Sequence, residues 1–323
     1  MKKIIALLLA VLMVLSMVAC ASKTTDDTPA DTTPADTTPA DTTTEDTEKT
    51  DEPADTTTDA EPVETDGEYA VAMITDYGDI TDQSFNQTTY EACKAFCEAN
   101  GITFNYFKPA GDNTADRVAM IEKAVDEGYN VIVMPGYAFG GAIVEAAPEY
   151  KDVKFVALDV GKGDLLEAGV AAAGETYDYN PDNWNLEDYV DMSNVYCAIY
   201  QEELCGYMAG YAAVKLGYEK LGFLGGMAVP AVIRYGYGFV QGVDAAAKEL
   251  DKTVELNYVY GNMFSGDPDI TAAMDVWYQG GTQVVFACGG GIYTSAVDAA
   301  KKVEGAKVIG VDVDQAGVIA NYA

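Results

Sequence analysis

The segment ITDYGDITDQSFNQ gathers the side chains that could do chemistry. Asp76, Asp79 and Asp82 supply carboxylates, and Phe85 and Asn86 follow them directly. Such a loop often carries glycines that cradle a phosphate, which carboxylates repel. A carboxylate instead accepts hydrogen bonds from sugar hydroxyls, an exposed aromatic ring can stack on a flat ligand, and an asparagine can pair with a heterocycle edge. The segment therefore favours a neutral ligand, either a flat base with a ribose or a plain sugar.

Ser84 and Gln87 also fit a capping box, which would explain Ser84 without any ligand. Phe85 would then be the first residue of a helix, where a contact with the core is hard to make. Two interpretations of Phe85 stay open. It either offers a stacking surface to a ligand or packs beneath the loop.

The loop lies between an expected strand and an expected helix, and this alternation continues along the chain. Several apolar runs are nearly continuous in Val, Ile, Leu and Phe, as in strands buried on both faces. The expected strands are 69–75, 102–107, 130–136, 154–160, 195–200, 220–226, 254–260, 283–288 and 307–312. The expected helices lie near 86–99, 114–127, 140–147, 202–216, 232–250, 269–279 and 292–303. The pattern predicts an α/β fold with parallel sheets and helices on both sides.

Two features favour two lobes over one large sheet. A polar stretch at 161–194 interrupts the alternation, and the pattern then restarts with glycine-rich turns at 225–226 and 289–291. Ligands of parallel sheets bind beyond the carboxyl ends of the strands, so two facing sheets would form a cleft. The polar stretch would form a lid over this cleft or decorate its rim.

Carboxylates, amides, aromatic rings and glycines follow the expected strands at one structural level. Because the carboxyl ends of parallel strands meet at one edge of a sheet, we expect these side chains to lie together. These side chains are Asp76, Phe85, Asn86, Tyr137, Phe139, Asp159, Tyr235, Phe264, Tyr293 and Asp312, together with the glycines at 289–291.

The first 20 residues, MKKIIALLLAVLMVLSMVAC, have the pattern of a secretory signal. The apolar run is shorter than the roughly 20 residues that a membrane-spanning helix needs. The stretch before Cys20 resembles the lipobox of bacterial lipoproteins, which predicts cleavage and acylation at Cys20. Residues 21–67 repeat the motif PADTT and hold almost no large apolar side chain, so we expect a disordered tether.

Charge and composition exclude several classes of function. The chain carries 19 basic and 52 acidic residues, which makes a nucleic-acid partner unexpected. It has only two arginines, Arg117 and Arg234, and this scarcity favours a neutral ligand because arginine forks usually bind phosphate and carboxylate. There is no histidine, so Ser-His-Asp and Cys-His catalysis are excluded. The cysteines other than Cys20 are expected to be small buried residues, and no cofactor or metal site is indicated.

Three runs beside the loop, KLGFLGGMAVPAVIRYGYGFVQGV, VVFACGGGIYTSAVDAA and VIGVDVDQ, make the chain recognisable. Residues 68–323 resemble the basic membrane protein family, whose members are PnrA-like purine nucleoside-binding lipoproteins of ABC transporters. The most specific matches are the Asp-x-Ser-Phe-Asn loop at 82–86 and Gly-Val-Asp-x-Asp-Gln at 310–315. The resemblance implies the type I periplasmic-binding-protein fold, with two Rossmann-like lobes joined by hinge strands.

The resemblance also implies a ligand-binding role for several of the residues that follow the expected strands. Phe85 would stack on the purine, with Tyr235 opposite it at a position where relatives usually carry Phe. Asp76 and Asn86 would address the base, and Asp312 would accept the ribose hydroxyls. Weaker candidates are Asp159, the backbone at Gly290, and Glu202 with Glu203.

The implied organisation has five parts. These are a signal peptide at 1–20, a tether at 21–67, an N-terminal lobe at 68–195, a C-terminal lobe at 196–312 and a hinge return at 313–323. Relatives continue with a Thr-Ser pair, a lysine that approaches the ligand, and closing helices, so the first lobe is expected to be truncated. The partners implied are a purine nucleoside, an ABC transporter permease and the membrane, reached through lipid on Cys20 at the extracytoplasmic face. Solute receptors of this kind are usually monomers.

Three alternatives remain at this stage. A receptor of the same fold could bind a sugar or signal molecule and feed a sensor. A metal-dependent nucleoside hydrolase could use Asp76, Asp79 and Asp82 around calcium. The acidic surface could instead belong to an adhesion module.

Overall fold

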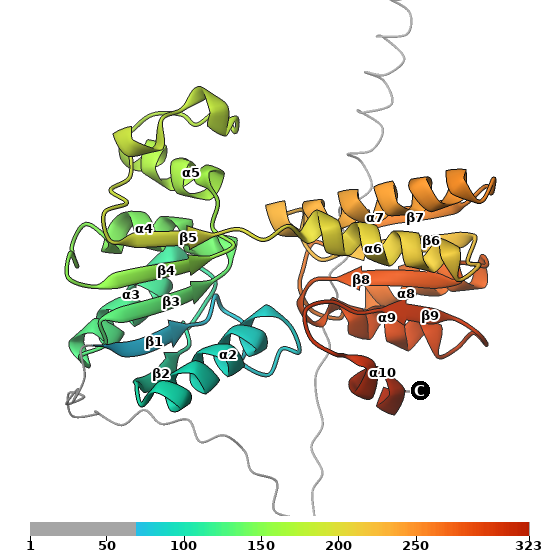
Figure 1. Ribbon diagram of the computed structural model, residues 1–323, viewed down its shortest axis with the longest axis horizontal. Helices are drawn as coiled ribbons and strands as arrows, with labels where there is room; N and C mark the ends of the chain where they lie inside the picture. The colour runs from blue at the N-terminus through green and yellow to red at the C-terminus, as the bar shows by residue number, and fades with distance from the viewer. Residues whose placement is uncertain (1–68, 323) are drawn as a thin grey trace, which may run out of the picture. The chain divides into compact units, whose positions relative to one another are not determined.

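The strands assemble into two separate parallel sheets in the computed structural model, which describes residues 69–322 (Figure 1). The first sheet has the strand order β2-β1-β3-β4-β5, and the second has the order β7-β6-β8-β9. The expectation of two lobes, and not one nine-stranded sheet, is therefore confirmed. Each sheet with its helices is called a domain below.

The first domain begins with the strand that leads into the candidate loop. Its strands are β1 (Ala70–Ile74), β2 (Thr103–Phe107), β3 (Val131–Pro135), β4 (Lys154–Leu158) and β5 (Val195–Ala198). Helices α3 (Thr114–Asp126), α4 (Gly140–Ala146) and α5 (Lys162–Ala172) pack on one face of this sheet. Helix α2 (Phe85–Asn100) packs on the other face, where Cys97 meets Val71 and Val133. Alternate residues of β1 thus reach opposite layers, as the pleat requires.

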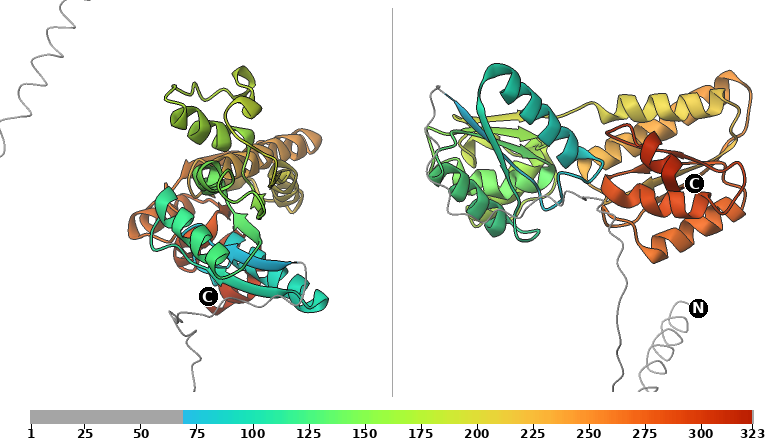
Figure 2. Two further views of the ribbon diagram at one scale, coloured as in Figure 1. Left: turned by 90° about the vertical axis from the view of Figure 1, so that its left-hand side faces the viewer. Right: turned by 90° about the horizontal axis from the view of Figure 1, so that it is seen from below.

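The second domain is covered by helices on both faces (Figure 2). Its strands are β6 (Lys220–Gly225), β7 (Glu255–Tyr260), β8 (Val284–Cys288) and β9 (Lys307–Ile309). Its helices are α6 (Glu202–Lys215), α7 (Pro230–Glu249), α8 (Pro268–Gln279), α9 (Tyr293–Ala300) and α10 (Ala316–Tyr322). Helices α6 and α7 bury Phe223, Phe239 and Phe286 on one face, while α8 and α9 cover the other.

Glycines set the spacing between α6 and α7. A Cβ atom added to Gly238 would lie 2.0 Å from the backbone oxygen of Glu203, and one added to Gly242 would lie 2.0 Å from that of Tyr207. Gly206 and Gly210 make equally close approaches from α6. Backbones this close leave no room for side chains, so the pair is a stiff unit that fixes residues at the start of both helices.

Helix α5 was not predicted, because the sequence around it looks like an interruption. It occupies 162–172 within the polar stretch and buries Leu165, Leu166 and Val170. The rest of that stretch is irregular and holds the aromatic contacts of Trp184 with Tyr177 and Tyr189. The expected interruption is thus part of the first domain, and its role as a lid stays a prediction.

The strand expectations are confirmed to within a few residues at each end, and α10 joins α5 as a helix that was not predicted. The proposed limit between residues 195 and 196 stays a prediction, and β5, which spans it, pairs with β4 of the first sheet. The signal, Cys20 and the tether lie outside the described residues. Within residues 69–322, no helix is both long and apolar enough to cross a membrane.

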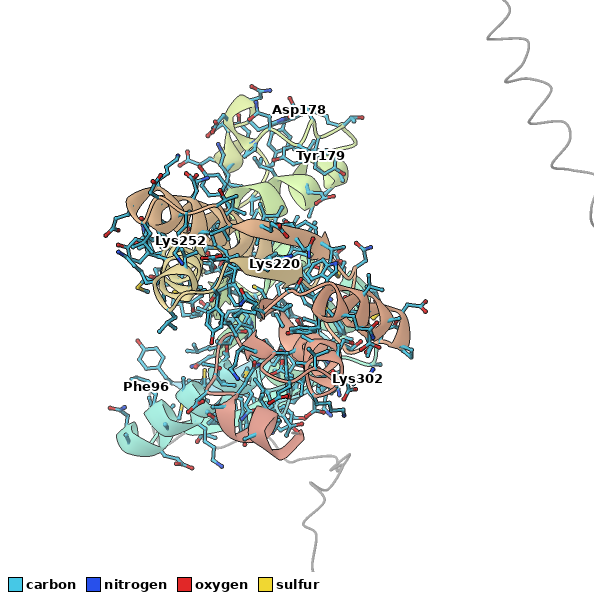
Figure 3. All side chains as sticks on the ribbon, turned by 90° about the vertical axis from the view of Figure 1, so that its right-hand side faces the viewer. Phe96, Asp178, Tyr179, Lys220, Lys252 and Lys302 are labelled. Carbon is cyan, nitrogen blue, oxygen red and sulfur yellow. The ribbon has the colours of Figure 1, made fainter. Side chains whose placement is uncertain are left out.

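Lysines on the second domain pair with neighbouring acids (Figure 3). Lys220, Lys252 and Lys302 contact Glu255, Glu219 and Asp275 at 3.3, 2.5 and 2.7 Å. The expectation that the cysteines are buried holds for Cys97 and Cys288 and is wrong for Cys205, which is exposed on α6. The close contact of α6 with α7 is made by the glycines Gly206 and Gly210, and Cys205 is not among the buried residues of α6.

Candidate functional site

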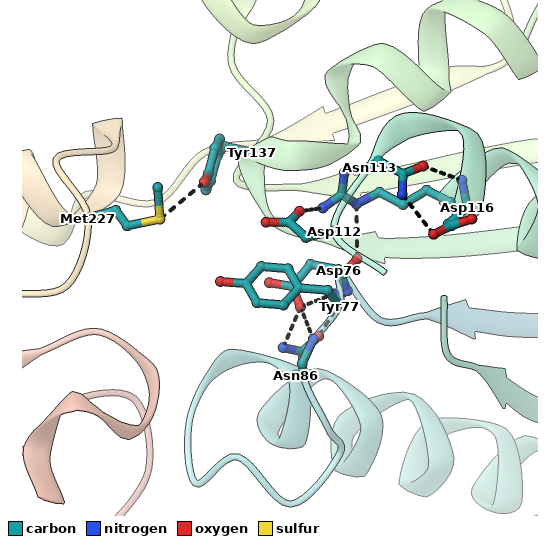
Figure 4. A network of polar contacts seen from close by, with 10 residues as sticks. Asp76, Tyr77, Asn86, Asp112, Asn113, Asp116, Tyr137 and Met227 are labelled. Carbon is teal, nitrogen blue, oxygen red and sulfur yellow. Dashed lines mark hydrogen bonds and ion pairs between the residues drawn. The ribbon is translucent and has the colours of Figure 1, made fainter. Parts of the chain in front are cut away.

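The loop after β1 is organised by Asp76 and Asn86 (Figure 4). The Asp76 backbone N–H donates to Asn86 Oδ1 at 3.2 Å, and Asn86 Nδ2 donates back to Asp76 Oδ1 at 3.0 Å. The backbone N–H groups of Tyr77 and Gly78 donate to the same carboxylate oxygen. Asn86 is buried, and its amide is engaged by these bonds. Its predicted contact with a base stays a prediction, while in this structure it holds Asp76 in place.

Asp82 caps helix α2, and the predicted capping box is wrong. Its carboxylate accepts from the backbone N–H groups of Ser84, Asn86 and Gln87. Ser84 is the N-cap residue, but its side chain makes no capping bond. The Gln87 side chain bonds to Gln83 instead of returning to Ser84. An anionic acceptor satisfies the first-turn donors better than a neutral hydroxyl, which frees Ser84 for another partner.

That partner belongs to the other domain. The buried Ser84 hydroxyl donates to Asp312 Oδ2, and Gln315 Nε2 donates to the backbone oxygen of Gln83 at 2.8 Å. Asp312 follows β9 with a φ of 66°, a left-handed conformation that is uncommon outside glycine. The residue is exposed to solvent. The motif at 310–315 therefore meets the loop at 82–86 directly.

A second contact between the domains is an ion pair. Asp159 follows β4, and its Oδ1 accepts from Arg234 Nη2 at 2.8 Å. The same guanidinium holds Glu202, with Nε donating to Oε2 at 2.6 Å and Nη2 donating to Oε1 at 3.1 Å. Asp159 also has a left-handed φ of 58°. Arg234 lies in the first turns of α7, and Glu202 begins α6. The close packing of these two helices therefore fixes the positions of both residues.

Two of the strand-end carboxyl groups, those of Asp159 and Asp312, have raised pKa values. Desolvation by the surrounding protein and then the charge of Glu202 raise the pKa of Asp159 to about 7, with Arg234 acting in the opposite direction. Desolvation also raises the pKa of Asp312, although its residue is open to solvent, while the Ser84 hydroxyl lowers it. Burial is the main cause for both groups, and the neighbouring acids add to it because like charges disfavour a second ionised group.

Two aromatic rings predicted to face each other pack differently. Phe85 is half-buried and meets the ring of Tyr200 edge-on, with centroids 6.0 Å apart at 88°. Tyr235 meets Phe286 in the same manner at 6.0 Å. Burial raises the pKa of Tyr235 and the charge of Asp312 adds to it, so that ring lies near the β9 end of the site. Opposed stacking of Phe85 and Tyr235 on a ligand stays a prediction.

Gly290 has a structural reason to be glycine. Its φ is 51°, and a Cβ atom there would lie 2.5 Å from the backbone oxygen of Phe264. Gly226 and Gly289 crowd the ring of the same phenylalanine. The glycines after β6 and β8 therefore seat Phe264, and the approach of a ligand to Gly290 stays a prediction.

The three aspartates of the opening loop do not converge. Asp79 is exposed and bonds to Lys108 at 3.0 Å, while Asp82 caps α2 and Asp76 binds Asn86. Over residues 69–322, no group of three or more Cys, Asp or Glu side chains is arranged to hold a metal ion. The arrangement does not favour calcium-dependent hydrolysis by these residues.

Three of the predicted carboxylates share one property. Asp76 Oδ1, Asp159 Oδ1 and Asp312 Oδ2 accept hydrogen bonds within the protein. The second oxygen of each receives no donor from the described residues. A carboxylate held by one oxygen keeps a directed acceptor on the other. The site can therefore accept several hydrogen bonds from a neutral donor molecule.

Sequence reasoning missed the partners of these carboxylates. Arg234 and Tyr200 were not singled out, Ser84 was assigned to a cap, and Glu202 was only a weak candidate. One signal was available, because Arg234 is one of two arginines and directly precedes Tyr235. Its engagement of Asp159 depends on contact between the domains, which local patterns do not encode.

The fold and the site together define a class. Two parallel α/β domains that contact each other through residues at the ends of their strands have the architecture of type I periplasmic solute-binding proteins. A solute-binding protein from Aeropyrum pernix shares the fold with a TM-score of 0.56 at 19% identity, over 72% of this chain and 58% of that one. A Thermotoga lettingae protein solved with 5-methylthioribose has a TM-score of 0.52 at 15% identity, over 77% and 70% of the two chains.

Sequence comparison identifies the family. A model of the family described as "ABC transporter substrate-binding protein PnrA-like" matches residues 69–322, and the chain belongs to this family. It is 27% identical to the nucleoside-binding protein BmpA of Lactococcus lactis, over 76% of this chain and 64% of that protein. It is also 27% identical to basic membrane protein B of Borreliella burgdorferi, over 76% and 65%. The chain thus spans about two thirds of these relatives, and the family is one of substrate-binding proteins, not of enzymes.

Proposed function

We propose that this protein is the extracytoplasmic solute-binding component of an ABC transporter and captures a purine nucleoside between its two domains. The family membership supports the transport role, and the name of the Lactococcus lactis relative supports the nucleoside. Ligand that contacts both domains would favour their closed arrangement by its differential affinity for it. The closed form would then be presented to a permease.

This proposal rests on three carboxylates that each accept hydrogen bonds from the protein with one oxygen only; we call them the half-engaged carboxylates. Asp76, Asp159 and Asp312 come from strand ends of both sheets, and each keeps one oxygen without a donor from residues 69–322. Hydroxyl and N–H groups of a nucleoside are neutral donors that match such acceptors. We assign the base edge to Asp76, positioned by Asn86, and the ribose hydroxyls to Asp312 and Asp159.

Aromatic residues complete the proposed binding site. Phe85 would stack on the purine, with its edge-on partner Tyr200 holding the ring upright. Tyr235 and the backbone at Gly290 would contact the ligand from the second domain. Stacking of a base on an aromatic ring contributes roughly 1–3 kcal/mol, which makes Phe85 a principal source of affinity.

Electrostatics favour a nucleoside over a nucleotide. Both arginines are engaged: Arg117 bonds to the backbone oxygen of Asp76 and to Asp112, and Arg234 bonds to Asp159 and Glu202. No arginine fork is therefore available among the described residues to neutralise a phosphate. The acidic groups at the strand ends would repel one.

Location follows from the N-terminal sequence. Acylation of Cys20 would anchor the protein at the outer face of the cell membrane, and residues 21–67 would act as the tether. Metabolic labelling with a fatty acid tests this directly. Label on the wild type and none on Cys20→Ala supports the anchor, and equal labelling of both rejects it.

Thermal-shift titration tests the ligand. We expect inosine, guanosine and adenosine to raise the unfolding midpoint by several degrees, since ligand at a hundred times its Kd adds about 2.7 kcal/mol. Phe85→Ala should remove this shift, and Phe96→Ala should keep it, because Phe96 is exposed elsewhere on the same helix. A shift with ribose or glucose alone would support a sugar receptor instead. Release of free base from inosine would indicate a hydrolase.

A further inference from the structure

We propose that Arg234 is a positioning residue that joins the two domains through Asp159 and keeps the second oxygen of that carboxylate available to a ligand hydroxyl. This inference rests on the proposed function, because it concerns the same site. It assigns to Arg234 a role in binding without any contact with the ligand.

The geometry of the guanidinium carries the argument. Arg234 uses Nε and Nη2 to grip both oxygens of Glu202, at 2.6 and 3.1 Å. Nη2 also reaches Asp159 Oδ1 at 2.8 Å. The planar fork of arginine makes such a two-carboxylate bridge, whereas a lysine ammonium lacks this fixed geometry. Among the described residues, only Oδ1 of Asp159 accepts a hydrogen bond, so its Oδ2 stays available as an acceptor.

The helices that carry Arg234 and Glu202 are packed rigidly against each other. Glu202 is 5% exposed and begins α6, which lies against α7 with almost no side-chain layer between them. The two helices therefore move together, and Arg234 cannot follow Asp159 if the first domain moves away. The bridge exists only in arrangements that bring the β4 end to the start of α7. It thus ties the position of Asp159 to the relative position of the domains.

The charges that face Asp159 come from four elements. Glu202 on α6 and Asp164 on α5 are anionic neighbours, Tyr200 follows β5, and Arg234 on α7 is the cation. Arg234 opposes the effect of burial and of both acids, and the pKa of Asp159 is about 7. The guanidinium therefore lowers the pKa of this carboxyl group against burial and Glu202 and favours its ionised form near neutral pH. An ionised carboxylate is purely an acceptor for a hydroxyl, whereas a protonated one is not.

The first test is the pH profile of binding, measured by isothermal titration with inosine between pH 5 and 9. Wild-type affinity should fall as pH drops through about 7. Arg234→Gln should move the midpoint of this profile upward by about one pH unit, since removal of a cation favours the neutral acid. Arg234→Lys keeps a cation at this position, so its pH midpoint should lie between those of the wild type and Arg234→Gln. Lys248→Gln removes an exposed cation of the same helix, paired with Asp244, and should leave the midpoint unchanged.

The second test needs no ligand. We expect the thermal midpoints of Asp159→Asn, Arg234→Gln and the double variant to be non-additive, because the two side chains contact each other directly. Additive shifts, or an unmoved pH midpoint in Arg234→Gln, would overturn the inference while nucleoside binding stands. If neither the wild type nor any variant binds inosine but the thermal midpoints remain non-additive, the proposed function is rejected. The ligand-positioning role of Arg234 is rejected with it, and its contact with Asp159 then only joins the two domains.

Discussion

Asp159 and Asp312 have similar positions in the two domains but different hydrogen-bond partners. Each follows a parallel strand, each has a left-handed φ of 58° or 66°, and each reaches a residue of the opposite domain. Asp159 meets a guanidinium that is already shared with Glu202, whereas Asp312 meets the neutral hydroxyl of Ser84. The side chain of Asp159 is 11% exposed, whereas Asp312 is open to solvent.

The difference lies in the charge of the partner. Asp159 lies beside the acid Glu202, so its carboxylate needs the counter-charge of Arg234, and losing that charge is costly. Burial raises the pKa of Asp312 as well, but a neutral hydroxyl holds that carboxyl group. The two contacts should therefore differ in energy and in pH dependence, although the backbone places both aspartates alike. The predictions below run from the largest expected effect to the smallest.

Arg234→Met should lower the free energy of unfolding by about 3 kcal/mol, because it leaves the buried Glu202 and the largely buried Asp159 without their cation. Proton uptake by Asp159 limits the loss. Urea denaturation at pH 8 measures it. Lys248→Met on the same helix is the control and should change stability by less than about 0.5 kcal/mol. A loss below about 1 kcal/mol for Arg234→Met would show that the bridge is solvated.

Stability should fall as pH rises from about 5 to about 7.5. The pKa of Asp159 is about 7 in the folded protein and has its ordinary value near 3.8 when unfolded. The folded state therefore holds the extra proton, and its contribution to stability is present below the unfolded pKa and lost as pH passes the folded one. The loss is about 2 kcal/mol. Thermal midpoints across this range should slope less steeply in Asp159→Asn, and parallel slopes would contradict the shift.

Ser84→Ala should lower the free energy of unfolding by about 1 kcal/mol, because it removes one neutral hydrogen-bond donor from the Asp312 carboxyl group. Chemical denaturation provides the measurement. Thr81→Ala is matched to it, since Thr81 donates its hydroxyl to Asp79 in the same loop within one domain. Should the two variants lose equal stability, the contact between Ser84 and Asp312 would add nothing beyond a surface hydrogen bond.

Much of the fold could be predicted from the sequence, because buried parallel strands are continuous apolar runs. Helix α5 was missed since Leu165, Leu166 and Val170 sit among glycines and acids without an amphipathic stripe. The site was predictable where topology alone places a residue, as for Asp76, Asp159 and Asp312 at strand ends. Its cross-domain partners were not, because Ser84 and Asp312 lie 228 residues apart and meet only in the folded chain.

The most direct test of the central claim compares inosine with 2′,3′-dideoxyinosine by isothermal titration of the purified protein. The two ligands share the base, so Phe85 and Asp76 can serve both equally. If Asp312 and Asp159 accept the ribose hydroxyls, the dideoxy compound should bind about 100-fold more weakly, the equivalent of about 2.7 kcal/mol. Equal affinities, or no binding of inosine at all, would contradict the assignment of the half-engaged carboxylates to a nucleoside.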